Sequence, residues 1–442
     1  MKPRGLSRVL WGISLPIMFA QVSEIVLHVT NTIFLARVGI VELGAIGIAD
    51  AIWEVFVVAP LGLVDGIQIL TARHLGRRQP EAAGAVFNQG LLLILLAGAA
   101  LSLLLRASVA GLSGWLVSSS DVGRATVDYL RIAAFGLPFV AANFAYSALL
   151  TSLGRTRVLV PATVLLAVTN CALDVVLIFG KLGMPALGMR GAGWASVGSE
   201  LVTFVFLTGS LVRLGEARRL HLFRFGAWRR KVVRRLVRIS APVAGQTLVE
   251  SLRWFGFFLI LEHVGAAALA VGNVVYVCYE VFRVPAEAFA EATCSMVSRF
   301  VGRDRPHRIE GVIHRSIAAA ALATLPMVAL GLLFPDRLLA AFTLDHDLVG
   351  AGIAGVRVVA LAMVVVIPAD MWFNAVVGTG DTPAALGIEL FLTAVMLSMA
   401  YLTAIVLPGG ALVWTSLAAA ALAALAISYA WFRSGRWRRA LA

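Results

Sequence analysis

The sequence predicts an all-α integral membrane protein with twelve transmembrane helices in two six-helix lobes, related by a pseudo-twofold axis along the membrane normal. Three observations lead to this prediction. Of the 442 residues, 60% are hydrophobic and only 14% are charged, and the mean hydropathy is +0.90. A soluble domain has about half apolar and about a quarter charged residues. Long apolar segments recur along the chain, and the second half of the chain repeats the first.

Each membrane-spanning helix needs about 20 mostly apolar residues. We place the spans at roughly 8–35, 43–71, 85–106, 122–150, 158–180, 190–213, 237–263, 266–298, 310–334, 347–377, 384–407 and 410–432. The short alternating segments typical of a β-barrel are not seen in this sequence.

An internal repeat divides these spans into two blocks of six. One constant shift along the chain superposes residues of the same type: Pro16 on Pro242, Glu24 on Glu250, Arg73 on Arg299 and Gly154 on Gly380. Because each block has an even number of spans, both blocks have the same orientation. We expect an N-lobe at 1–215, a basic cytoplasmic linker at 216–236 and a C-lobe at 237–442. Repeats of this kind are typical of secondary transporters, whereas a channel of identical subunits needs no doubled chain.

The net charge of +13 is distributed unevenly between the loops. Clusters of Lys and Arg occur at the N-terminus, in the loop at 72–78, between 213 and 238, at 299–308 and at 433–439. With twelve spans, all these clusters fall on one side of the membrane. The positive-inside rule places that side and both termini in the cytoplasm. We therefore expect a multi-pass protein of the cell (inner) membrane whose partner is the lipid bilayer, and no binding of nucleic acid.

Polar residues inside the N-lobe spans are candidates for function, because charge in a bilayer is costly. Gln21, Glu24, His28 and Asn31 fall on one face of the first helix, which we expect to face the bundle or a hydrated cavity. We interpret His28 as an interior histidine. Glu54 lies on the second span, and Asn170 and Asp174 lie one turn apart on the fifth.

The C-lobe carries a second set of such residues. Glu250 and Arg253 lie on the seventh span, and Asp370 lies on the tenth. Glu280, Arg283 and Glu287 follow one another at helical spacing on the eighth span, where they either neutralise one another or serve transport.

The chemistry of buried carboxylates indicates what these residues could do. A carboxylate in a low-dielectric environment can hold a proton near neutral pH and release it when the cavity hydrates. Together with amide oxygens, an ionised carboxylate can instead bind Na⁺, a hard cation that prefers oxygen ligands. We predict H⁺ or Na⁺ as the coupling ion, with a Na⁺ site at Glu250 and Asp370 or at Asn170 and Asp174.

Several stretches in one order resemble the multidrug and toxic compound extrusion (MATE) family over essentially the whole chain. They are "SLPIMFAQ" and "SAPVAGQ", which open the two halves, followed within the halves by "VTNTIFLARVG", "LLTSLGRTR", "TNCALDVVLIFG", "MRGAGWAS" and "DMWFNAVVGTGDT". The resemblance implies a cation-coupled antiporter that exports organic, cationic and amphipathic compounds by alternating access between two lobes.

The resemblance also assigns coupling residues. In the C-lobe it points to Glu250, eight residues after Pro242, and to Asp370, which precedes "GTGDT"; a tyrosine of the family is replaced by Val366. In the N-lobe it points to Asn170 and Asp174.

The first helix departs from the family pattern, because Asn31 stands where relatives have an aspartate, and an amide cannot carry the proton. We hypothesise that Glu24, the repeat counterpart of Glu250, replaces it and faces Asp174. Glu54 and Glu280 complete the predicted coupling and cavity residues.

An alternative function is that of a flippase for lipid-linked or polysaccharide precursors in the same broader superfamily. Arg253 and Arg283 would favour it if they faced the cavity unpaired, and neutralisation by Glu250, Glu280 or Glu287 would favour export of organic cations. The major facilitator superfamily fits less well, because the loop at 72–78 lacks the aspartate of its signature. We find no nucleophile–base or metal constellation, and therefore expect a monomeric secondary transporter of small organic substrates, with no enzymatic activity and no cofactor.

Overall fold

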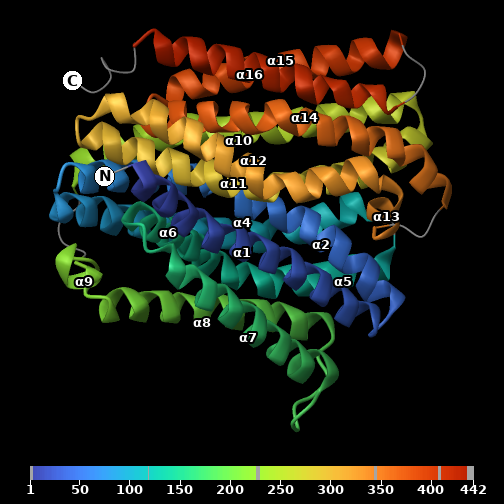
Figure 1. The fold of residues 1–442 in the computed structure, drawn as a ribbon. Coiled ribbons are helices and arrows are strands. Elements are labelled where there is room, and N and C mark those ends of the chain that lie inside the picture. The colour runs from blue at the N-terminus through green and yellow to red at the C-terminus, as the bar shows by residue number, and fades with distance from the viewer. Residues whose placement is uncertain (1–2, 118, 225–228, 343–345, 407–409, 436–442) are drawn as a thin grey trace. The chain divides into compact units, whose positions relative to one another are not determined.

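The computed structural model describes residues 3–117, 119–224, 229–342, 346–406 and 410–435. These residues form long α-helices joined by short turns and four short 3₁₀ helices, and the described ranges contain no strand. This confirms the predicted all-α fold class (Figure 1). The chain divides into two compact units, which we call the N-unit (Pro16–Ser240) and the C-unit (Met1–Leu15 with Ala241–Ala442).

The N-unit contains most of the first long helix, α1 (Pro3–Ala36), and the beginning of α10 (Arg230–Val264). Its other helices are α2 (Ile40–Val58), α3 (Leu61–Gly76), α4 (Pro80–Leu116), α5 (Ser120–Ala133), α6 (Leu137–Leu153), α7 (Leu159–Phe179), α8 (Met189–Arg213) and α9 (Glu216–Arg219). Apolar side chains from α1, α2, α4, α5 and α8 form one buried core, which includes Leu35, Ala49, Leu105, Leu130 and Ala192.

Two predicted spans of the N-unit are each broken into two helices. The span predicted at 43–71 is interrupted between α2 and α3 at Ala59 and Pro60. The span predicted at 122–150 is interrupted by a 3₁₀ turn at Ala134–Gly136, just before Pro138. A proline lacks the backbone N–H and its ring clashes with the preceding turn, which explains why both breaks occur beside proline.

The basic segment after α8 is packed onto the N-unit. The Asn88 side chain on α4 donates to the carbonyl of His221 at 2.9 Å and accepts from the N–H of Phe223 at 2.9 Å. At Gly84 an added Cβ would lie 1.6 Å from the carbonyl oxygen of Leu220, so only glycine permits this approach. The described residues of the segment predicted as a linker therefore belong to the N-unit, and the boundary between the two compact units falls at Ser240 and Ala241.

The C-unit contains the rest of α10 and the helices α11 (Ala266–Gly302), α12 (Ile309–Leu333), α13 (Pro335–Ala340), α14 (His346–Thr379), α15 (Thr382–Val406) and α16 (Thr415–Arg433). Helices α11 and α14 pack closely: an added Cβ at Gly378 would lie 2.6 Å from the Cys294 carbonyl oxygen. Aromatic rings of α10 pack on Trp414, with Phe257 at 4.8 Å between ring centroids. Unlike the two interrupted spans of the N-unit, α11 and α14 stay continuous through Pro285 and Pro368.

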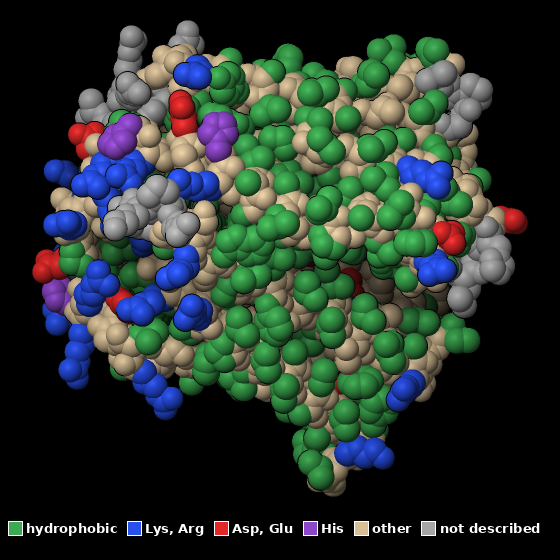
Figure 2. All heavy atoms as spheres, viewed as in Figure 1, with side chains coloured by type: hydrophobic (Ala, Val, Ile, Leu, Met, Phe, Trp, Pro, Cys, Tyr) green, Lys and Arg blue, Asp and Glu red, His purple; other side chains and the backbone are tan. Residues whose placement is uncertain are grey.

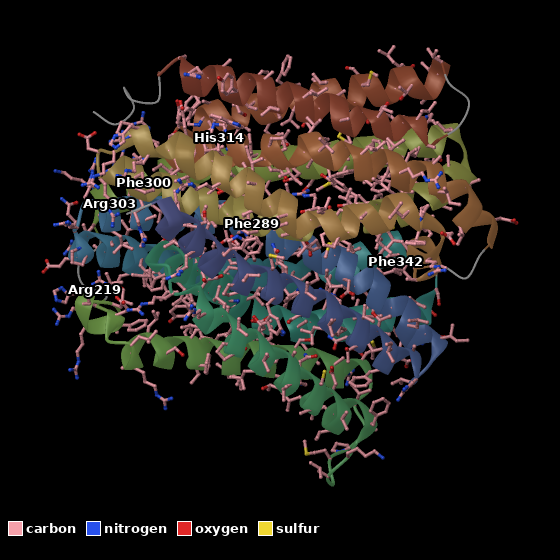
Figure 3. The ribbon with its side chains drawn as sticks, viewed as in Figure 1. Arg219, Phe289, Phe300, Arg303, His314 and Phe342 are labelled. Carbon is pink, nitrogen blue, oxygen red and sulfur yellow. The ribbon has the colours of Figure 1, made fainter. Side chains whose placement is uncertain are left out.

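Eleven helical segments among the described residues are long and apolar enough to cross a membrane. Helix α10 is the exception among the twelve predicted spans, because Gln246, Glu250 and Arg253 make it more polar. Figure 2 shows hydrophobic side chains over the middle of the visible face of each unit, with Lys and Arg gathered toward the helix ends. Within the C-unit, Figure 3 shows Phe289 along α11, with Phe300 and Arg303 toward the end of that helix.

Candidate functional site

In the N-unit, the polar face of α1 lies beside that of α2. The His28 Nδ1 atom is 3.7 Å from Asp50 Oδ2, and Glu24 and Glu54 also lie within electrostatic range of the His28 ring. The side chain of His28 is more than half exposed, so this histidine is not the interior residue that the sequence suggested. The structure thus groups three acids around one histidine along α1 and α2.

Asn170 and Asp174 lie deep within the N-unit, each only 1% exposed. The Asn170 amide donates to Ser199 Oγ on α8 at 3.5 Å, whereas both carboxylate oxygens of Asp174 are buried without a hydrogen-bond partner among the described residues. An unpartnered buried carboxylate is costly, and a bound proton or cation would remove that cost. The predicted pair is therefore present, but the predicted contact between Glu24 and Asp174 stays a prediction.

Sequence reasoning missed an acid in this unit. Glu200 lies on α8, and its Oε2 atom accepts from the Asn143 amide of α6 at 2.7 Å. The Glu200 side chain also lies within electrostatic range of Glu24. One signal could have identified it: Glu200 is the only acidic residue in the apolar segment Met189–Arg213.

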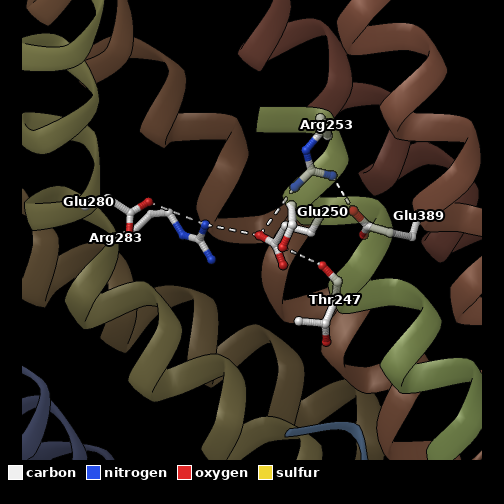
Figure 4. Close-up of polar contacts among 7 residues, drawn as sticks. Thr247, Glu250, Arg253, Glu280, Arg283 and Glu389 are labelled. Atoms are coloured by element: carbon white, nitrogen blue, oxygen red, sulfur yellow. Dashed lines mark hydrogen bonds and ion pairs between the residues drawn. The ribbon is translucent and has the colours of Figure 1, made fainter. Parts of the chain in front are cut away.

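The C-unit brings five charged residues of α10, α11 and α15 into one cluster, which we call the C-unit charge cluster: Glu250, Arg253, Glu280, Arg283 and Glu389 (Figure 4). Arg253 Nη2 and Arg283 Nη1 each lie 3.4 Å from the same Glu250 oxygen, Oε1. Arg283 Nη1 is also 3.8 Å from Glu280 Oε1. Both predicted arginines are therefore paired with carboxylates.

Glu389 on α15 is the second acid that sequence reasoning missed. Its carboxylate oxygen accepts from Arg253 Nη1, so one guanidinium joins α10 to α15 and also reaches Glu250 (Figure 4). As with Glu200, the available signal was a single acid in an apolar helix, because Thr382–Val406 contains no other charged residue.

Asp370 on α14 belongs to the electrostatic surroundings of this cluster. It lies within range of the charges on Arg283, Glu250 and Glu287. The Asn374 amide donates to the backbone carbonyl of Asp370 at 3.1 Å, so this contact holds the helix backbone and leaves the carboxylate unengaged by that amide. The two acids predicted for the C-lobe, Glu250 and Asp370, thus share one electrostatic environment.

The two side chains most exposed in the C-unit charge cluster are acidic. The side chains of Glu250 and Glu280 are 39% and 42% exposed, whereas Arg253 and Glu389 are 10% and 7% exposed. Three carboxylates face two guanidinium groups, so the cluster has one negative charge in excess when all five are ionised. This arrangement suits an incoming cation better than an anion.

A multi-pass helical fold with ionisable groups paired between its helices is typical of membrane transporters. The MatE family model matches residues 16–176 and 242–402, and the chain belongs to this family of MATE transporters. The two matched segments have equal length and begin at 16 and 242, which places Pro16 on Pro242, as the predicted internal repeat does.

Curated relatives agree with this assignment. A probable multidrug resistance protein NorM of Chromobacterium violaceum is 32% identical over 193 residues, covering 43% of this chain and 41% of the relative. One of Aromatoleum aromaticum is 28% identical over 268 residues, covering 59% and 56%. The matches thus span about half the length of these two relatives. One of Thermotoga maritima is 23% identical over 370 residues, covering 84% and 79%.

Solved structures share the fold. A crystal structure of MATE in complex with MaL6 has a TM-score of 0.89 at 21% identity, covering 99% of this chain and 97% of that one. A MOP superfamily transporter from Pyrococcus furiosus, whose reverse polarity of the binding pocket suggests a different function, has a TM-score of 0.87 at 21% identity, covering 99% and 96%.

Proposed function

We propose that this chain is a cation-coupled antiporter that exports organic, cationic amphipathic compounds across the cell (inner) membrane by alternating access. The observation that carries the proposal is the excess of partly exposed carboxylate in the C-unit charge cluster. Glu250 shares one oxygen, Oε1, between two arginines, and its side chain is 39% exposed. A proton or Na⁺ can therefore bind Glu250 in competition with these arginines, and Asp370 lies in the same field.

The pairing of the arginines supports this function over the flippase alternative. An anionic lipid-linked precursor would need guanidinium groups free to bind it, whereas Arg253 contacts Glu389 and Glu250, and Arg283 contacts Glu250 and Glu280. Neutralised arginines support the transport of cations. The printed names of the relatives, which are multidrug resistance proteins, point in the same direction.

The remaining features of the proposal follow from the chemistry of the two units. The coupling ion is H⁺ or Na⁺, bound at Glu250 and Asp370 or at Asn170 and Asp174. The protein works as a monomer in the lipid bilayer, with both termini in the cytoplasm because the Lys and Arg clusters lie in the loops of that side. The N-lobe, linker and C-lobe boundaries predicted at 215 and 237 stay part of this proposal.

The experiment is efflux of a fluorescent cationic dye from proteoliposomes under a pH gradient and, separately, a Na⁺ gradient. We expect one gradient to drive efflux and Glu250→Gln and Asp370→Asn to abolish the response. A wild-type protein that responds to neither gradient would refute the coupled mechanism. Efflux of dye carrying a negative charge in preference to the cationic dye would favour the flippase alternative.

A further inference from the structure

Glu389 is a buried acid on α15 whose helix carries no other charge. An ionised carboxylate in an apolar environment is retained only when it is paired. Its partner is Arg253 on the neighbouring helix α10, through Nη1. The same guanidinium reaches Glu250 through Nη2 at 3.4 Å, so Arg253 divides its two terminal nitrogens between two carboxylates (Figure 4).

The division matters because Glu250 is already in contact with a second guanidinium. Arg283 Nη1 lies 3.4 Å from Glu250 Oε1, the same oxygen that Arg253 Nη2 reaches. The charged and titratable side chains around Glu250 are Arg253 on α10, Tyr276, Glu280 and Arg283 on α11, Asp370 on α14 and Glu389 on α15. Glu389 is the member of this set that competes with Glu250 for Arg253.

We propose that Glu389 is a positioning residue for cation coupling: it holds Arg253 by one nitrogen and thereby keeps Glu250 available to the coupling cation. This inference rests on the proposed function and adds a residue to it. Without the Glu389 carboxylate, Glu250 is the one acidic contact left to Arg253 among the residues that the structure describes. Arg253 then no longer shares its charge with Glu389, so Glu250 faces the charges of both Arg253 and Arg283. The cluster also loses its excess negative charge. Both changes weaken the binding of H⁺ or Na⁺ at Glu250.

The test measures gradient-driven dye efflux as a function of the concentration of the coupling cation. Glu389→Gln keeps the shape of the side chain and removes its charge. We expect the half-saturating cation concentration to rise about tenfold, the equivalent of about 1.4 kcal/mol, which is a shift of about one pH unit toward acid if the cation is H⁺. Glu389→Asp restores the charge and should return this concentration to within about threefold of wild type.

A matched control lies one turn along the same helix. Thr393→Val removes the buried hydroxyl of a partly buried side chain of α15 without changing the charge, and should leave the half-saturating concentration unchanged. If Glu389→Gln lowers only the maximal rate and leaves the half-saturating concentration within about twofold of wild type, Glu389 is a packing residue and the inference is wrong.

Failure of the proposed function gives a different result. Glu250→Gln is measured in the same vesicles, and it should abolish the response to the cation. If Glu250→Gln retains full coupling, the cation does not act at Glu250. The proposed function at this site and the proposed role of Glu389 are then both refuted. If Glu250→Gln abolishes coupling and Glu389→Gln leaves the cation dependence unchanged, only the proposed role of Glu389 is refuted.

Discussion

Replacement of Arg253 by Met tests how the C-unit charge cluster contributes to stability. The variant removes the partner of Glu389, whose side chain is 7% exposed, and leaves an uncompensated carboxylate between α10 and α15. Breaking a buried ion pair from one side costs about 3–5 kcal/mol. Since about 1 kcal/mol corresponds to about 2–4 °C for a unit of roughly 200 residues, the Tm should fall by about 6–20 °C.

Arg283→Met is the matched control, because it removes the same charge from the same cluster. Its partners Glu250 and Glu280 are 39% and 42% exposed, and a partly solvated pair contributes about 1 kcal/mol or less. Two such pairs amount to about 2 kcal/mol at most, so we expect a smaller loss than for Arg253→Met, of no more than about 8 °C. The assay is the thermal transition of the purified protein in detergent, followed by tryptophan fluorescence.

A second arm removes both members of the buried pair. Replacing a buried ion pair by apolar residues of similar volume is often neutral or stabilising, so Arg253→Met with Glu389→Leu should recover most of the lost Tm. The reasoning is refuted if Arg253→Met melts with the wild type, or if the double variant is no more stable than Arg253→Met alone.

Three further predictions concern other parts of the chain. Glu24→Gln should impair gradient-driven efflux if Glu24 replaces the acid missing at Asn31. Unimpaired efflux would refute that hypothesis. Asn88→Ala removes two hydrogen bonds to the linker backbone, at about 1 kcal/mol each, and should speed cleavage of the 216–224 segment in limited proteolysis; cleavage at the wild-type rate would contradict the docking of this segment. In a variant without the native cysteines, a cysteine at Arg303 should react with a membrane-impermeant thiol reagent only from the cytoplasmic side, and one at Leu182, which is 89% exposed, only from the outside; the reverse labelling would overturn the topology.

The sequence was sufficient to predict the fold class, but it was not sufficient to predict which charged residues pair with one another. Apolar segments and an internal repeat can be recognised in a single amino-acid sequence, so no structure was needed to find them. The partner of Arg253 could not: Glu250 is a neighbour at helical spacing, whereas Glu389 comes from a distant helix that packs on α10. Pairings of this kind depend on which helix faces meet, and a single sequence does not contain that information.

The helix breaks and the linker illustrate the same limit. Both helix breaks of the N-unit lie beside proline, at Pro60 and before Pro138, yet Pro285 and Pro368 lie within continuous helices. Packing around each proline decides the outcome. The linker was assigned from its charge, whereas its docking depends on Gly84 and Asn88 of α4, whose roles become visible only beside the folded segment.

The boundary between the units falls inside helices α1 and α10, and this makes the halves of the chain mutually dependent. The first fifteen residues belong to the C-unit, where Trp11 packs edge-on against Phe289 at 4.9 Å between ring centroids. The start of α10 belongs to the N-unit, where Gly66 leaves room for Ser240. Two polypeptides produced by cutting the gene in the linker would therefore each lack a piece held by the other. Co-expressed fragments should complement each other, and neither should fold well alone.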